Sequence, residues 1–68
     1  MEKVTGEIIK AERLKQGLSQ GELAQLVGVT QDSISLWELG KRLPDTRYIV
    51  LLCEALNISA DYLLGITN

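Results

Sequence analysis

The chain has 68 residues, with one cysteine and no histidine. These counts exclude an intrachain disulfide, and they exclude a structural zinc site, which usually takes about four Cys or His ligands. Seven Lys and Arg residues against nine Asp and Glu residues give a net charge of −2, so attraction to a polyanion would need a local basic face. With 46% hydrophobic and 24% charged residues, the composition is that of a globular protein.

The chain shows no targeting or membrane-spanning segment. No apolar run approaches the ~18 residues of a transmembrane helix. The first five residues, MEKVT, lack the apolar stretch of a signal peptide. We therefore expect a single domain over residues 1–68, located in the cytoplasm, with its thiol reduced.

The first expected helix is defined by residues that favour helix ends. Thr5 is predicted to cap it, with Val4 and Ile9 placed as a hydrophobic staple. Ile9, Leu14 and the stem of Arg13 are expected to share one broad face of it. Gly17 is predicted to end it in the left-handed conformation.

The next two helices have stronger local signals. Ser19 and Glu22 have the spacing of a capping box, and Gly28 is predicted to end that helix. Thr30 is predicted to cap the third helix, and Gly40 to end it.

Two further helices follow the turn at Pro44. Asp45 is predicted to cap the fourth and Asn57 to end it, while Ser59 is predicted to cap a short fifth helix before Gly65. No segment has the sustained alternation of a β-strand. The sequence thus predicts an all-α fold of five helices.

The second and third expected helices form the most informative pair, at about residues 19–39. Only Gly28, Val29 and a cap residue join them. So short a turn makes two helices cross steeply, as in a helix-turn-helix, and leaves the second free to project. An α-helix fits the major groove of DNA.

The motifs of the chain resemble those of one family. The residues that carry the resemblance are Gly17-Leu18-Ser19-Gln20, Glu22-Leu23-Ala24, Gly28-Val29-Thr30, Ile34, Trp37-Glu38, Gly40-Lys41-Arg42, Pro44 and residues 55–65. They resemble the Cro/cI-type (xenobiotic-response-element-like) helix-turn-helix domains over about residues 6–65. The resemblance implies a compact lambda-repressor-like fold. It also implies a transcriptional regulator, expected to be a repressor, that binds a palindromic operator in double-stranded DNA as a homodimer with its third helix in the major groove.

The resemblance places the base contacts on the third helix, at Gln31, Asp32, Ser33 and Leu36. A glutamine can bind adenine through two hydrogen bonds, an aspartate can accept from cytosine, and an apolar side chain can touch a thymine methyl. Three alternatives remain open. Asp32 would equally serve its own helix dipole, Ser33 would face solvent, and Leu36 would contact another protein.

The resemblance also implies phosphate contacts, at Gln20, Thr30, Trp37, Lys41 and Arg42. The unpaired N–H groups at the start of the second helix would favour a phosphate beside Gln20. Alternatively, Gln20 supports the capping box, the two cations are merely solvated, and Trp37 packs at the edge of the core with its N–H free for a partner.

Arg13 and Glu38 are expected to form a structural salt bridge, because members of this family pair an arginine of the first helix with a glutamate that ends the third. Cys53 is expected on the inward face of the fourth helix. Dimerisation is expected through the C-terminal region, by Ile58, Tyr62 and Ile66.

A second hypothesis is a protein-interaction module on the same fold, such as an antitoxin or a corepressor-like adapter. The low isoelectric point, which follows from the net negative charge, favours it, as do the apolar Leu36 and Leu39. The DNA hypothesis instead requires one positive face made by Lys41 and Arg42 with Lys10 or Lys15.

No residues are arranged for catalysis, so we expect no enzyme, no metal, no cofactor and no small-molecule ligand. With no room for an appended regulatory domain, control is expected from concentration, a protein partner or an antirepressor.

Overall fold

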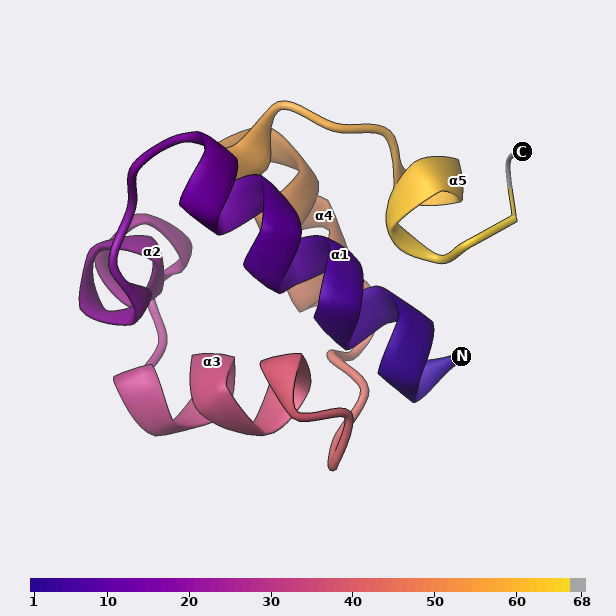
Figure 1. Ribbon diagram of the computed structural model, residues 1–68, viewed down its shortest axis with the longest axis horizontal. Helices are drawn as coiled ribbons and strands as arrows, with labels where there is room; N and C mark the ends of the chain where they lie inside the picture. Colours follow the sequence, from indigo (N-terminus) through magenta and orange to yellow (C-terminus); the bar gives the residue numbers. More distant parts are fainter. Residues whose placement is uncertain (67–68) are drawn as a thin grey trace.

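The computed structural model describes residues 1–66, and every regular element among them is a helix (Figure 1). The helices are α1 (Glu2–Lys15), α2 (Gln20–Val27), α3 (Gln31–Glu38), α4 (Thr46–Leu56) and α5 (Ala60–Leu63). In Figure 1, α1 crosses the front of the molecule and α4 passes behind it. The short α5 lies beside the N-terminal end of α1, and α3 lies along the lower edge.

One hydrophobic core lies among the five helices. Its buried members are Ile9, Leu23, Ala24, Val27, Ile34, Trp37, Ile49, Leu52, Leu56 and Leu63. Each helix contributes at least one of them, and α1 packs on α3, α4 and α5. The core therefore fixes α3 through α1 and α2, while α3 itself stays at the edge of the molecule.

The predicted N-caps of the last four helices are confirmed. Ser19 Oγ accepts the Glu22 N–H at 3.0 Å, and the Glu22 carboxylate accepts the Ser19 N–H at 2.8 Å. Thr30, Asp45 and Ser59 likewise accept the N–H three residues on, at 3.1–3.3 Å. Each bond satisfies a backbone donor that the helix leaves unpaired.

The predicted start of the first helix is wrong. Helix α1 begins at Glu2, and Thr5 lies fully buried inside it instead of capping it. Val4 is therefore helical and cannot form a staple with Ile9. Val4 instead lies beside Gly65, where an added Cβ would be 2.9 Å from the Val4 Cγ1. Packing against the end of α5 thus extends the helix beyond the point that local signals indicate.

The predicted place of Leu14 on one face with Ile9 is also wrong, since its side chain is 58% exposed. Leu14 follows Ile9 by five residues, which is about 140° around a helix of 3.6 residues per turn. Arg13 follows Ile9 by four residues, so it shares the inward face and is buried.

At Gly6 the backbones of α1 and α3 lie close together. A Cβ added at Gly6 would lie 2.2 Å from the carbonyl oxygen of Trp37 and 2.8 Å from that of Glu38. Only glycine leaves room for this approach. Gly6 therefore sets how α3 lies against α1.

Candidate nucleic-acid interface

The turn between α2 and α3 determines how α3 is presented. Gly28 adopts the left-handed conformation, with φ +86°, and ends α2. The Val29 N–H then donates to the Ala24 carbonyl at 3.0 Å, while its half-buried side chain packs on the core. The chain thereby reverses within a few residues, and α3 leaves with its first turn at the surface.

A buried ion pair anchors the far end of α3. Arg13 Nε lies 2.6 Å from Glu38 Oε2, and the two side chains are 9% and 4% exposed. Arg13 also donates to Glu38 Oε1 at 3.1 Å and to the Leu18 carbonyl at 2.9 Å. The expected pair is therefore present, and it joins α1, the end of α3 and the loop before α2.

Hydrogen bonds continue from this ion pair to the start of α3. Gln20 Nε2 donates to Glu38 Oε1 at 3.0 Å, and Gln20 Oε1 accepts from Gln31 Nε2 at 3.4 Å. With both ends of its amide engaged, Gln20 has one fixed orientation and one N–H still free. Gln31 likewise keeps one N–H and its amide oxygen.

The remaining groups of Gln31 match an adenine edge. One N–H and one acceptor oxygen are what adenine N7 and N6 require of a glutamine. Gln31 and Asp32 are exposed. Ser33 is half-buried, and its hydroxyl lies 3.2 Å from that of the Thr30 cap. The first turn of α3 thus presents polar groups at the surface.

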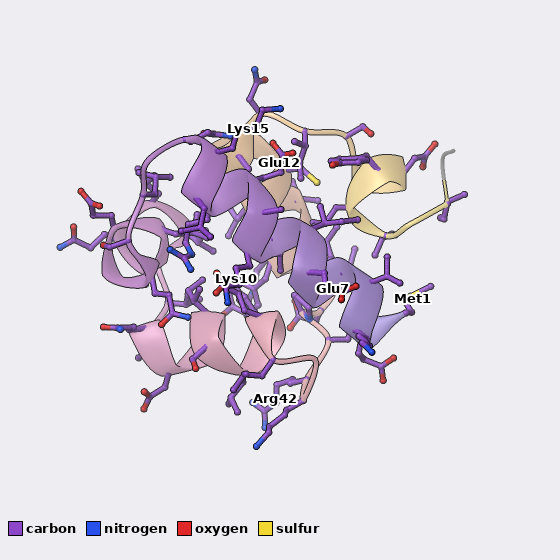
Figure 2. All side chains as sticks on the ribbon, in the orientation of Figure 1. Met1, Glu7, Lys10, Glu12, Lys15 and Arg42 are labelled. Carbon is purple, nitrogen blue, oxygen red and sulfur yellow. The ribbon has the colours of Figure 1, made fainter. Side chains whose placement is uncertain are left out.

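The second half of α3 is more apolar. Leu36 is half-buried, and Leu39, just after the helix, is 64% exposed. Lys41 and Arg42 follow and are exposed. Figure 2 shows Lys15 and Arg42 at opposite edges of the molecule, so Lys15 does not extend a basic surface around Arg42.

A pocket of about 300 Å³ lies between α3 and the start of α4. Its lining residues are Ser33, Trp37, Arg42, Leu43, Asp45 and Tyr48. The pocket brings together three of the predicted contact residues: Ser33, Trp37 and Arg42. Tyr48 was not predicted here, because no motif in the sequence marks a tyrosine three residues after a cap.

Trp37 belongs to the core more fully than its predicted place at the edge implied. It is 4% exposed, and its ring centroid lies 5.7 Å from that of Tyr48. Within residues 1–66 its indole N–H has no hydrogen-bond acceptor. Part of the tryptophan lines the pocket.

The residues expected at a dimer interface lie around α5. Ile58 is half-buried, Tyr62 is 40% exposed and Ile66 is 64% exposed. The Tyr62 hydroxyl donates to the Glu12 carboxylate at 3.3 Å, which ties α5 to α1. This surface lies away from the pocket beside α3.

Electrostatic effects on the titratable groups are local. The hydrogen bond that Arg13 donates to Glu38 raises the pKa of Arg13, against the opposing effect of burial. Hydrogen bonds from Ser19 lower the pKa of Glu22. Burial raises the pKa of the half-buried Cys53 thiol, which lowers its reactivity.

Within residues 1–66 no cluster of His, Cys, Asp and Glu side chains could hold a metal ion. None of the helices in this part of the chain has the length and apolar character that a membrane crossing requires.

Comparison with known proteins agrees with this geometry. The model of the helix-turn-helix family matches residues 9–63, which covers all of α2, α3, α4 and α5. The chain belongs to the helix-turn-helix family. The match includes the turn at Gly28 and the ion-paired residues Arg13 and Glu38.

Two curated relatives of this helix-turn-helix chain are regulators of viral origin. The chain is 36% identical over 63 residues to YonR, a prophage-derived HTH-type transcriptional regulator of Bacillus subtilis (strain 168). It is 41% identical over 59 residues to the repressor protein C2 of Salmonella phage P22. These matches cover 93% and 87% of this chain, but only 58% and 27% of the relatives.

A solved structure matches the helix-turn-helix fold closely. It is the P22 c2 repressor protein in complex with a synthetic operator, with a TM-score of 0.90 and 38% sequence identity. The match covers 94% of this chain and 97% of that one. The five-helix, lambda-repressor-like fold expected from the sequence is therefore confirmed.

Proposed function

We propose that this protein is a sequence-specific DNA-binding transcriptional regulator, and that it acts as a repressor. It binds a palindromic operator as a homodimer and inserts α3 of each copy into the major groove. The observation that carries this proposal is the match along 94% of the chain to a repressor solved on its operator. The polar, exposed first turn of α3 supports it independently.

Base contacts come from the outward side of α3. Gln31 donates one hydrogen bond to Gln20, which leaves its second N–H and its amide oxygen free to bind adenine. Asp32 and Ser33 follow it in the first turn. Leu36, one turn further on, would contact a thymine methyl. These four residues determine which sequence is bound.

Phosphate contacts come from both sides of α3. Gln20 keeps one N–H free at the start of α2, and the Thr30 hydroxyl lies at the start of α3. Trp37 lies in the last turn of α3, and Lys41 and Arg42 follow the helix. These contacts set register and affinity but carry no sequence information directly.

The dimer forms through Ile58, Tyr62 and Ile66. Two copies paired in this way would present their α3 helices to successive major grooves, about 34 Å apart. The protein acts in the cytoplasm of a bacterial or phage-infected cell. Protein concentration, a protein partner or an antirepressor controls it.

Selection from a random duplex library tests this proposal, with binding then followed against salt concentration. A palindrome with half-sites about one helical turn apart is the expected product. Affinity should fall steeply with salt, since each neutralised phosphate contributes about 0.9 to the slope. Failure to enrich any sequence, with no salt-dependent binding at low ionic strength, would contradict the proposal.

A second candidate is a protein-interaction module on the same fold, such as an antitoxin or a corepressor-like adapter. The 64% exposure of Leu39 favours it, because the residue lies beside the cations that would meet DNA. Replacing Leu39 with Arg separates the two functions. It should strengthen DNA binding by adding a cation, whereas an interaction module would lose affinity for its protein partner.

A further inference from the structure

Tyr48, which lines the pocket beside α3, contacts Arg47 and Trp37 through its ring. The Arg47 guanidinium lies 4.7 Å from the centroid of the Tyr48 ring, and that ring in turn packs on Trp37 at 5.7 Å. Arg47 Nη2 also donates to the Tyr48 hydroxyl oxygen at 3.1 Å. The ring and the oxygen of Tyr48 are therefore both held in place.

This arrangement leaves the pocket with unused hydrogen-bond donors. Because the Tyr48 oxygen accepts from Arg47, its own O–H remains available, and it has no acceptor within residues 1–66. The Trp37 N–H also lacks an acceptor in the same part of the chain, and Arg42 lines the pocket without a hydrogen-bond or ion-pair partner among residues 1–66. Three residues that line one pocket and carry unused donors favour an anion.

The pocket lies where a DNA backbone would pass. Ser33 and Trp37 line it, and at a spacing of four residues they share one side of α3. A helix with its side chains is about 10–12 Å across, and the major groove is about 12 Å wide. Groups on the flank of a helix in the groove therefore lie against phosphates.

We propose that this pocket binds one phosphate of the DNA backbone, with the Tyr48 hydroxyl and the Arg42 guanidinium as its principal donors. The inference rests on the proposed function and adds a residue of α4 to the interface. Arg47 is a positioning residue that orients the phenol. A neutral hydroxyl contributes affinity here without contributing to the salt dependence.

Asp45 opposes the same phosphate. Its carboxylate lines the pocket, and its position is fixed because it caps α4 through the Tyr48 N–H at 3.3 Å. A negative charge beside a bound phosphate weakens binding. Asn caps helices about as well as Asp, so the charge can be removed while the cap is kept.

The first test is Tyr48→Phe, which retains the ring contacts and removes only the hydroxyl. Binding is measured to the duplex obtained by selection, unmodified and with single methylphosphonates at each flanking phosphate. The variant should bind the unmodified duplex about tenfold more weakly for each half-site, as expected for one hydrogen bond to a charged group. The salt dependence should not change.

One flanking phosphate should account for this loss. At that phosphate the methylphosphonate should reduce the affinity of the wild type much more than that of Tyr48→Phe. The variant already lacks the hydrogen bond that the methylphosphonate removes. At every other position the two proteins should respond alike. A loss that is the same at all positions would contradict a phosphate contact by Tyr48.

The second test is a gain of affinity, which a folding defect cannot imitate. Asp45→Asn should tighten binding several-fold, by about the Coulomb energy of a charge pair near the surface. Glu54→Gln is the matched control: it makes the same change in net charge on α4, about 13 Å further along the helix. That distance exceeds the Debye length of about 8 Å at physiological salt, so its affinity should not change.

The outcomes separate the inference from the function it rests on. Wild-type binding with no effect of Tyr48→Phe, or equal gains for Asp45→Asn and Glu54→Gln, would overturn the inference alone. Absence of DNA binding by the wild type would overturn both. A loss at one phosphate together with a gain specific to Asp45→Asn would establish the site.

Discussion

The two ends of α3 differ in their exposure to solvent and in the contacts that hold them. The first turn, with Gln31 and Asp32, is exposed, and its polar groups are largely free. The last turn is buried: Trp37 is in the core and Glu38 is ion-paired, with the backbone of Gly6 against both carbonyls. One helix of eight residues thus combines a free end with an anchored end.

This difference separates substitutions that change stability from those that change sequence preference. Changes at the anchored end, or at the residues of α1 that hold it, should reduce the free energy of unfolding. Changes at the free end should leave stability intact and alter binding at single base pairs. The hydrogen bonds of Gln20 to Glu38 and Gln31 connect the two ends.

The largest effect should come from Arg13→Ala. Removing one partner of a buried ion pair leaves an uncompensated charge and costs roughly 3–5 kcal/mol. A domain of this size has only about that much stability, so the variant should be largely unfolded and lose DNA binding for that reason. Urea denaturation followed by circular dichroism measures it, with Lys15→Ala at the exposed end of α1 as the control.

An Arg13→Ala protein that folds as stably as the wild type but binds DNA more weakly would contradict this structural role. It would mean that Arg13 acts on DNA instead of on α3.

Gly6→Ala should have the next largest effect. Its new methyl group would meet the Trp37 carbonyl oxygen at 2.2 Å, so α1 and α3 must separate. Overpacking of this kind costs about 1–3 kcal/mol. Gly21→Ala is the matched control, because its methyl group would have only an ordinary contact at 3.7 Å.

Thermal unfolding measures the stability of the two alanine variants. Gly21→Ala should gain up to about 1 kcal/mol from helix propensity, while Gly6→Ala loses stability. Equal changes in the two variants would show that the contact of Gly6 with α3 is unimportant.

Gln31→Ala tests the free end of α3. It should relax preference at one base pair, at a cost of about 1–3 kcal/mol, without changing stability. Competition binding with duplexes that vary that base pair measures it. Gln25→Ala, an exposed amide on α2, is the control. Uniform weakening at all sequences would indicate a phosphate contact by Gln31 instead.

The smallest effect should be the pH dependence from Glu22. Its pKa is lowered from the ordinary 4.5 by the Ser19 hydrogen bonds, so the ionised form stabilises the folded state. This contribution is complete above the ordinary pKa and is lost as the pH falls through the lowered one. The difference in melting temperature between wild type and Glu22→Gln should therefore shrink on acidification, and a constant difference would argue against this ionic contribution.

The residues that the sequence predicted correctly are those whose partners lie nearby in the chain. Ser19, Thr30, Asp45 and Ser59 each bond an N–H three residues away, so local spacing identifies them. Thr5 has the same chemistry, but contacts with the distant end of α5 extend the helix beyond it. The capping rule therefore identified the N-caps correctly wherever no distant contact extended the helix.

The same reasoning explains which parts of the candidate site escaped prediction. Gly6 matters because of carbonyls more than thirty residues away, and Tyr48 because its ring packs on Trp37 of another helix. The resemblance to a family did indicate the ion pair, since it carries information about distant partners. The roles in DNA binding assigned to Gln31, Asp32, Ser33 and Leu36 stay predictions.

The first turn of α1 has a mechanical consequence. Gly40, at the end of α3, would place a Cβ 3.2 Å from the Lys3 Cα, and Gly65 would place one 2.9 Å from Val4. The same turn is thus wedged between the helix proposed to enter DNA and the segment proposed to pair two copies. A shift of either one would press on the other through this turn, which would couple the proposed operator binding to the proposed subunit pairing.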